Sequence, residues 1–534
     1  MKLRSTAVAL SLLIASLPLI AQEHQHQMDA SEKLGNVSFP ISCRIDVQKP
    51  FEHAVAQLHS FEYEPAGNEF KQIAEKDPTC AMAYWGQAMS LFHGLWSRPS
   101  KPDLKRGEEL SEKAQQLKAN TPREREYVDA VALLFHDSDK VDHHQRVNNY
   151  AKAMEQVATD NPKDREAQVF YALALLAADH GDPTHTNDRK AVGILNKLFD
   201  EQPDHPGIAH YIIHACDNPA MASLGLSAAR KYAAIAPASS HAVHMPSHIF
   251  ARLGLWQDSI ASNSAALKVA DKMAAMHLHT MHHRMHAMDF MQYAYLQIGD
   301  DANAKSMYEK LTRYKREEVE EDYQDYYDEM KTGYAALYAV ERRQWKEAIT
   351  LEPVAGAKPN IQAQTYWARA VGAGHLHDVT AAQDAQKHYE EGLEALRKGP
   401  KAYLVDGLKS ETDEVQAWTL YAQGKTDEAI KILRATADRQ DKVGKFEVEI
   451  PAREMLADML LESGHAKEAL AEYEVALKTD PNRFNELAGA AQAADKLSQK
   501  DKSSTYYAQL VKNCQGVASD RPELAKAKTL VAAK

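Results

Sequence analysis

The sequence predicts an all-α protein built as one long array of packed helix pairs. Ala, Leu, Glu and Lys are abundant, whereas only 23 of the 534 residues are Gly and 21 are Pro. Aliphatic residues recur at the spacing of amphipathic helices rather than in the alternating pattern of strands. Similar blocks of small and aromatic residues return along the chain, as in repeat proteins. A solenoid explains a chain of this length better than several unrelated domains.

The first residues have the features of an export signal. Lys2 and Arg4 precede an apolar run that ends just before Ala21, a small residue suited to cleavage. This run is too short for a stable span, and no later segment reaches the roughly 18 apolar residues of a membrane helix. We expect a signal peptide over residues 1–21 and an extended segment over residues 22–46. The mature chain is then periplasmic or secreted, without a membrane span.

Repeated motifs identify the kind of solenoid. The segment after Gly464 reads Ala469-x3-Tyr473-x2-Ala476-x4-Pro481, and residues 66–78 follow related spacing. Partial copies mark further turns between helices: Gly254-x-Trp256, Gly299-x4-Ala304-x3-Tyr308, Trp345-x2-Ala348 and Gly424-x4-Ala429. These motifs resemble the tetratricopeptide repeat (TPR), in which small residues let two antiparallel helices approach and proline ends the second. The resemblance covers most of residues 47–512 and implies a TPR-type α-solenoid.

Longer blocks resemble a bacterial group of exported, histidine-rich TPR proteins: CAMAYWGQAMS, HPGIAHYIIHACD, HAVHMPSHIFARLGLW and EIPAREMLADMLLE. That group has no settled activity, so the resemblance implies a fold and a location but no chemistry. Histidines become sparse after the acidic tract that begins near residue 316. We therefore expect a site-bearing half over residues 47–315, and a scaffold or partner surface over residues 316–534.

Histidines on one helical face are the candidate functional residues. His241, His244 and His248 cover an arc of about 60° on a helix, and Pro246 between them is expected to kink it. His244 and His248 lie about 34 residues, the length of one repeat, after His210 and His214. Three imidazoles on one stripe form a candidate metal or ligand surface.

The TPR resemblance implies which residues face the concave, ligand-binding groove. In three successive repeats, the groove-facing positions of the first helix hold His210, His214, Asp217, His241, His244, His248, His286, Asp289 and Tyr293. Nearer the N-terminus, His59, His93 and Trp85 fall at such positions. The six clustered histidines are the predicted metal ligands, and the other residues are predicted to line the groove or to support the ligands.

Imidazoles from neighbouring helices suit a transition metal. Helices pack about 8–10 Å apart, so side chains of two helices can reach one ion at about 2 Å each. The histidines could supply three ligands to each of two ions, or one three-histidine site with supporting partners. Copper is our preferred metal, with iron or zinc as alternatives. A different possibility is an anionic ligand, bound by the imidazoles with Arg252 and Arg284 assisting.

A methionine-rich and histidine-rich stretch, residues 273–291, adds to the case for copper, because thioethers and imidazoles together suit that metal. Its six methionines are equally well suited to filling gaps between helices, which is the interpretation we favour. For His277, His279, His282 and His283, both an exposed loop and metal ligation are open.

Other chemistries lack support in the sequence. The net charge of −12 argues against non-specific nucleic-acid binding. The run from His210 to His214 has Tyr211 where a zinc protease carries its catalytic glutamate. Phosphate-binding loops, serine nucleophile elbows and Cys-x-x-Cys motifs are absent from the sequence. Cys43 and Cys80 flank the first repeat, where a disulfide would close a loop, and free thiols are the alternative.

Three functions follow from these observations. The first is an exported binding protein whose groove holds a metal, with a small-molecule or peptide ligand and other periplasmic proteins as partners. The second is a copper- or iron-dependent oxidase or oxygenase, with Tyr293 or Asp289 as proton or electron partner. The third is a plain peptide-binding scaffold in which the histidines only shape the groove. Solenoids are mostly binding modules, which favours the first or third function.

Overall fold

A computed structural model describes residues 33–532, except 96, 180, 277–279, 400 and 446–447. Regular structure in this part is helical, with no strand. The all-α solenoid prediction is therefore confirmed. The predicted signal peptide, His277 and His279 lie outside the described residues.

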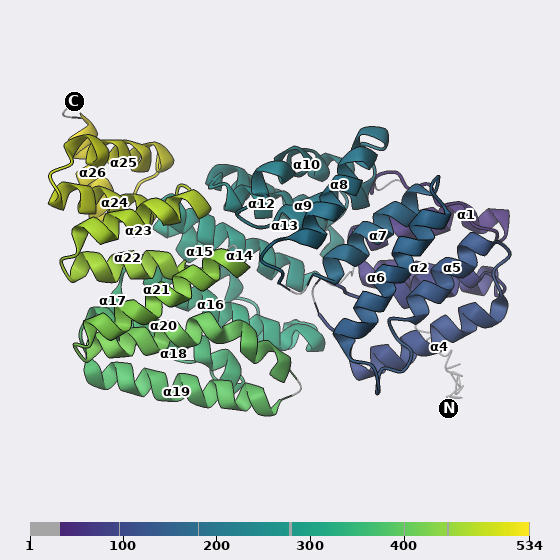
Figure 1. The fold of residues 1–534 in the computed structure, drawn as a ribbon, viewed down its shortest axis with the longest axis horizontal. Coiled ribbons are helices and arrows are strands. Elements are labelled where there is room, and N and C mark those ends of the chain that lie inside the picture. Colours follow the sequence, from purple (N-terminus) through teal and green to yellow (C-terminus); the bar gives the residue numbers. More distant parts are fainter. Residues whose placement is uncertain are drawn as a thin grey trace, which may run out of the picture.

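The N-terminal end, purple to blue in Figure 1, is a series of helix pairs whose consecutive members pack together. The elements are η1 (Ile45–Val47), α1 (Gln48–His59), α2 (Tyr63–Lys76), α3 (Ala81–Met89), α4 (Lys101–Leu117), α5 (Pro122–Ala132), α6 (His143–Asp160), α7 (Arg165–Ala177) and α8 (Thr186–Glu201). Side chains of Ser100, Thr121, Asp142 and Asp164 cap helices by accepting hydrogen bonds from backbone N–H groups.

The middle of the chain carries most of the predicted histidines. Its helices are α9 (Pro206–Cys216), α10 (Ala222–Ile235), α11 (Ser240–His244), α12 (Pro246–Arg252), α13 (Trp256–Ala275), α14 (Met281–Gln297) and α15 (Asp301–Leu311). Pro246 does more than the expected kink, because the helix is interrupted at Met245 and restarts with Pro246 in its first turn.

The C-terminal helices, green to yellow in Figure 1, continue the array. They are η2 (Arg316–Glu318), η3 (Glu321–Tyr323), α16 (Gln324–Glu341), α17 (Trp345–Ala348), α18 (Pro359–His375), α19 (Val379–Lys398), η4 (Ala402–Leu408), α20 (Lys409–Ala422), α21 (Thr426–Val443), α22 (Ala452–Glu462), α23 (Ala466–Thr479), α24 (Phe484–Lys496), α25 (Lys500–Asn513) and α26 (Pro522–Ala532). None of the helices in the described part combines the length and apolar character that a bilayer crossing requires.

Small residues shape the pairs as the repeat pattern predicts. The turn glycines have positive φ angles, which glycine adopts readily: Gly254, Gly299, Gly424 and Gly464. Gly86 lies directly under the ring of Phe70, where a Cβ atom would stand 2.4 Å from Phe70 Cδ1. Gly489 meets Tyr473 in the same way, at 2.3 Å from Cζ. These contacts hold neighbouring helices close together.

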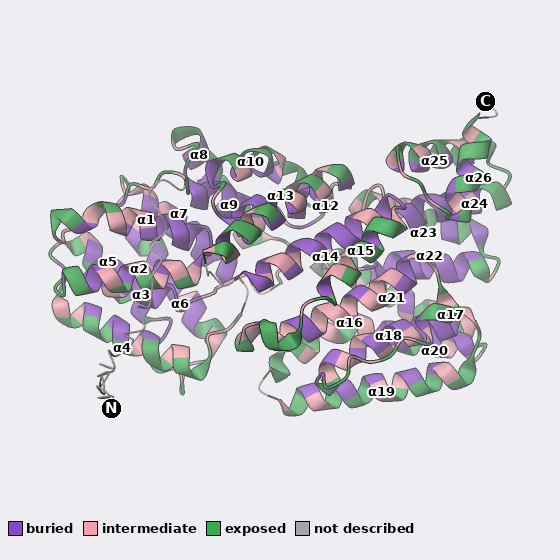
Figure 2. Ribbon diagram, turned by 180° about the vertical axis from the view of Figure 1, so that it is seen from behind, coloured by how far each residue is buried: buried purple, intermediate pink, exposed green. Residues whose placement is uncertain are grey.

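Buried residues, purple in Figure 2, occur in helices along the whole array. One large cluster extends from Phe39 to Phe250, and another extends from Ala336 to Ala494. A smaller cluster between them is built around buried methionines of α14. This packing matches the gap-filling interpretation of Met281, Met285, Met288 and Met291.

Two further contacts organise the molecule. A disulfide joins Cys43 to Cys80, so the segment before α1 is bonded to the residue that precedes α3. The C-terminal half packs back against the middle helices: the indole Nε1 of Trp256 donates to the carbonyl of Asn482 at 2.8 Å, and Arg252 donates to the carbonyl of Lys445 at 2.8 Å.

Candidate metal centre

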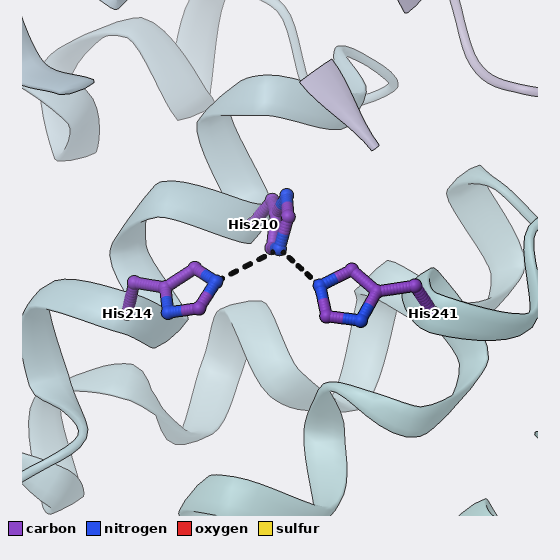
Figure 3. A group of neighbouring side chains, drawn as sticks. All are labelled: His210, His214 and His241. Atoms are coloured by element: carbon purple, nitrogen blue, oxygen red, sulfur yellow. Dashed lines mark hydrogen bonds between the residues drawn. The ribbon is translucent and has the colours of Figure 1, made fainter. Parts of the chain in front are cut away.

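Three of the predicted ligands meet between α9 and α11. The Nε2 atom of His210 lies 3.1 Å from Nε2 of His214 and 3.1 Å from Nε2 of His241. Figure 3 shows the ring of His210 between the other two rings. His210 and His241 are buried, and His214 is half-buried. We call these three residues the first triad.

A hydrogen bond at Nδ1 determines which nitrogen of the His210 ring carries the proton. Nδ1 lies 2.7 Å from the backbone carbonyl oxygen of His59, which can only accept a hydrogen bond. Burial, reinforced by the neighbouring His59 and His248, lowers the pKa of His210 to about 3, so the ring is neutral at pH 7. A neutral ring with its proton on Nδ1 presents a lone pair at Nε2, towards the other two rings.

The other three predicted ligands meet among α11, α12 and α14. Nε2 of His244 lies 3.0 Å from Nε2 of His248. The ring centre of His286 lies 4.5 Å from that of His244 and 5.7 Å from that of His248. The potential ligand atoms of the three residues lie within 4.8 Å of one another. We call these residues the second triad.

Two rings of the second triad are also oriented through Nδ1. The side-chain oxygen of Asn263 lies 2.6 Å from Nδ1 of His244, while the amide nitrogen of Asn263 donates to the carbonyl of Ser259. Nδ1 of His248 lies 2.8 Å from Oδ2 of Asp217, an acceptor. In its neutral form each ring therefore carries its proton on Nδ1 and its lone pair on Nε2. With both rings neutral, two lone pairs would face each other across 3.0 Å.

These separations fit a shared metal ion. Two imidazole nitrogens bound at about 2.0–2.1 Å to one ion, at angles of about 95 to 109°, lie roughly 2.9 to 3.4 Å apart. Three of the six pairs in the two triads have Nε2–Nε2 distances of 3.0, 3.1 and 3.1 Å, and the ligand atoms of each triad all lie within 4.8 Å of one another. Metal-bound histidines characteristically donate their other N–H to a carbonyl or carboxylate, as His210, His244 and His248 do here.

The two triads are neighbours. The ring centres of His241 and His244 lie 6.1 Å apart, and those of His214 and His248 lie 6.3 Å apart. Burial holds the pKa of His241 and of His244 well below the usual range, and the surrounding imidazoles lower both further. His210, His241 and His244 therefore offer neutral nitrogen donors, the form in which histidine binds metals.

A second buried network supports the first triad and was missed in the sequence. Nε2 of His59 and Nε2 of His205 lie 2.9 and 2.8 Å from the two carboxylate oxygens of Glu166, and Nδ1 of His59 lies 2.9 Å from the hydroxyl of Tyr211. A Cβ atom at Gly207 would stand 2.6 Å from Nδ1 of His59. His59, predicted to line the groove, therefore acts through its backbone carbonyl, which orients the first triad.

Asp217 takes the supporting role that the sequence left open. Its two oxygens accept from Nδ1 of His248 at 2.8 Å and from Nε of Arg252 at 2.9 Å. Because Arg252 also donates to the carbonyl of Lys445, this carboxylate connects the second triad to the C-terminal half. Arg284 instead pairs with Asp271, at 2.8 Å.

Two predicted residues of α14 have other partners. The hydroxyl of Tyr293 donates to the carbonyl of Glu449 at 3.1 Å and accepts from the guanidinium of Arg483. Burial raises the pKa of Tyr326 and Tyr334 above the usual range, and the nearby charge of Asp289 adds to both shifts. Tyr293 therefore faces the C-terminal half, and Asp289 lies near Tyr326 and Tyr334 of α16.

Trp85, predicted to line the groove, is buried in the structure. Phe39, from the segment before α1, lies 5.7 Å from Trp85, between ring centres. Phe39 also packs against Phe51, Tyr127 and Phe170, on α1, α5 and α7. The N-terminal segment thus places its own aromatic side chain against this face, so Trp85 belongs to the core instead of a ligand surface.

A cleft of about 550 Å³ lies beside the first triad. Phe61 lines this cleft, and its ring centre lies 4.3 Å from that of His210. His93, predicted for the groove, also lines it, as do His282 and His283 from the methionine-rich stretch. The ring of His283 lies 6.0 Å from that of His241. The cleft therefore reaches the edge of the histidine cluster.

Comparisons with known proteins give no name for this site. No family model matches the chain, and no curated protein matches it. Among solved structures, the chain is similar to the human IFIT1 dimer with m7Gppp-AAAA, with a TM-score of 0.36 and 12% identity over 82% of this chain and 90% of that chain. It is also similar to Naa15/Naa10 bound to HypK-THB, with a TM-score of 0.23 and 11% identity over 91% and 96%. These likenesses are too weak to bear on the site.

Proposed function

We propose that this protein is an exported TPR-type binding protein whose two histidine triads each hold a transition-metal ion. The first triad would supply His210, His214 and His241, and the second would supply the remaining three predicted ligands. Membership of the exported histidine-rich TPR group, and a periplasmic or secreted location, belong to this proposal. The disulfide between Cys43 and Cys80 supports the location, because such bonds persist in oxidising compartments.

The observation that carries the proposal is the position of the ring protons. His244 and His248 both donate through Nδ1, so their Nε2 lone pairs face each other at 3.0 Å in a buried place. Two facing lone pairs repel unless a cation lies between them. A proton on either ring would also relieve this repulsion; burial lowers the pKa of His244 and disfavours a proton on that ring, whereas the carboxylate of Asp217 lies beside His248. A metal ion satisfies every ring without a buried proton.

The donor set favours copper, with zinc and iron as competitors. Three neutral imidazoles suit all three metals, but affinity for nitrogen donors among divalent ions is greatest for Cu²⁺. Thioether ligands do not enter this argument, because Met281, Met285, Met288 and Met291 pack into a hydrophobic core. Three protein ligands leave a fourth coordination position for water or a ligand, as in catalytic zinc sites.

The test is elemental analysis of protein purified without a histidine tag and reconstituted with copper or zinc. We expect two ions per chain in the wild type. His210→Ala should retain only the ion of the second triad, His244→Ala only that of the first, and the double variant neither. The matched control is His388→Ala/His465→Ala, which alters two histidines of the C-terminal half and should keep both ions.

Two outcomes would contradict the proposal. Wild-type protein that takes up no metal would favour the third function, a peptide-binding scaffold. Full metal content in the folded double variant would place the ions elsewhere. Circular dichroism of each variant checks that the solenoid has formed, so that loss of metal is not confused with unfolding.

A second function is supported by a separate observation, the cleft beside the first triad. Phe61 separates this cleft from His210, His214 and His241, so a substrate bound there would lie close to the proposed ion. This geometry suits an oxidase or oxygenase. The test is oxygen uptake by the copper-loaded protein with ascorbate as reductant. Oxygen uptake that is faster than with free copper and that disappears in His210→Ala would support the enzyme. If no such uptake is seen, only the binding function remains.

A further inference from the structure

A buried carboxylate at the edge of the cleft lacks a full counter-charge. Glu62 directly precedes α2, lines the cleft, and is only 4% exposed. Its Oε1 accepts from the hydroxyl of Ser239 at 2.7 Å. Among the described residues, no lysine or arginine forms an ion pair with it. Buried carboxylates are normally paired with a cation, so Glu62 is poised to accept one.

The neighbouring imidazole is in the same position. His283 is 8% exposed and lines the cleft, and its Nε2 lies 3.8 Å from Oε2 of Glu62. This distance is too long for a hydrogen bond. No hydrogen bond joins the His283 ring to any other described residue, although the ring packs against His282 and His241. Glu62 and His283 thus both line the cleft, and their two polar atoms lie close enough for one donor group in the cleft to reach both.

Aromatic rings border the same space on two sides. Tyr63 and His93, from the α2 and α3 side, stack with ring centres 4.1 Å apart. His282 and Tyr323, from the α14 and η3 side, stack at 4.4 Å. The faces of aromatic rings attract organic cations, and a carboxylate among such rings is a common way to hold an ammonium group.

We propose that this cleft binds a small organic cation, a protonated amine with an apolar or aromatic body. The ammonium group would donate to Oε2 of Glu62 and to Nε2 of His283, while the body would lie against Phe61 and Tyr63. This site goes beyond the proposed metal function and does not depend on it, because neither Glu62 nor His283 belongs to a triad.

The basic residues of the cleft do not oppose this choice. Lys71 and Arg106 lie at the exposed rim, and Arg106 pairs with Glu109 at 3.3 Å. Water and salt screen exposed charges, whereas the carboxylate of Glu62 is removed from water. The buried charge therefore determines which ligand the inner end of the cleft accepts.

The test compares three probes of one shape and different charge: benzylamine, benzyl alcohol and benzoate. Binding is measured by isothermal titration calorimetry at pH 7 on the full chain, after metal removal with EDTA, so that an amine cannot bind through an ion. We expect benzylamine to bind at least tenfold more tightly than either other probe. Glu62→Gln should lose about tenfold or more of this affinity, because a charge-assisted hydrogen bond is lost.

The matched control is Glu64→Gln, which removes an exposed charge from the rim of the same cleft and should change the affinity little. Glutamine at position 62 can still accept from Ser239, which favours a folded variant. If it does not fold, the three-probe comparison on the wild type decides alone. Absence of benzylamine binding, equal or tighter binding of benzoate or benzyl alcohol, or an unchanged affinity in folded Glu62→Gln would overturn the proposal. Metal content plays no part in these outcomes.

Discussion

The histidine triads and the arginine network of the C-terminal half are two buried polar clusters on the same scaffold, and they are completed differently. Arg483 is fully buried and donates to Glu341 and Glu454 at 2.8 Å each. Its charge is balanced within the chain. In the second triad, Nε2 of His244 and Nε2 of His248 instead lie 3.0 Å apart, with both Nδ1 atoms beside side-chain oxygens. The arginine network holds its own cation, Arg483, whereas we propose that the triads take theirs from outside the chain.

The largest effect that would sharpen this comparison is the loss of Arg483. Arg483→Met leaves Glu341 and Glu454 as buried carboxylates without their cation, and we expect the free energy of unfolding to fall by about 3–5 kcal/mol. Urea denaturation followed by circular dichroism measures the loss. Arg434→Met, which removes a partly exposed partner of Glu468 and Glu472, is the control and should cost about 0–1 kcal/mol. Equal losses in the two variants would show that the network is not a special source of stability.

Metal binding to the two triads should raise the free energy of unfolding, whereas the loss of Arg483 should lower it. One ion at a free concentration of 100 times its Kd stabilises the folded state by about 2.7 kcal/mol. We expect copper or zinc to raise the midpoint of thermal unfolding of the wild type. Glu414→Gln, which alters the C-terminal half, is the control and should show the same rise. The shift should disappear in His210→Ala/His244→Ala. An equal shift in that double variant would mean that the ions act elsewhere.

A smaller effect is expected from the carboxylate that orients His248. Asp217→Asn keeps an acceptor near Nδ1 but removes its charge, and changes of this kind typically cost about 10- to 100-fold in metal affinity. Competition with a chelator of known affinity measures the change. Asp258→Asn, which alters an exposed pair with Arg230, is the matched control. If both variants lose affinity equally, Asp217 has no particular role at the site.

The smallest effect concerns a buried acid of the C-terminal half. Burial raises the pKa of Glu414 well above the usual range, and the charge of Glu449 adds to this, while Trp367 donates to Oε2 at 2.8 Å. A raised folded-state pKa means that the contribution is complete below the unfolded pKa of about 4.5 and is lost as pH rises towards the folded pKa. Glu414→Gln should therefore match the wild type near pH 4 and be more stable near pH 8. Urea denaturation at both pH values checks this, and parallel pH profiles would contradict it.

Local patterns were enough to predict the helices and the grouping of histidines. The spacing of His241, His244 and His248 is a property of one segment, and the repeat register extended it to His210 and His214. The same register grouped Tyr293 with His286, but the C-terminal half packs against α14 and supplies Arg483 to Tyr293. Register within a repeat cannot predict which distant helix covers its end.

The residues that the sequence did not single out come from distant parts of the chain. Glu62, just before α2, and His283, on α14, approach each other, and Glu166 joins two histidines from different repeats. Asn263 is one polar residue on a helix, with no local feature that marks it as the acceptor for His244. Such contacts depend on how the helix pairs stack, which no motif encodes.

The bond between Cys43 and Cys80 has a consequence for how the array comes apart. Solenoids lose structure from their ends, because a terminal repeat has a neighbour on one side only. A cross-link that closes a segment at the N-terminal end opposes that fraying. Helix α1 follows Cys43 and ends at His59, whose backbone carbonyl fixes the tautomer of His210. A reducing agent that breaks this bond should therefore loosen the N-terminal end of the array first. The first triad should be affected only after that end has loosened.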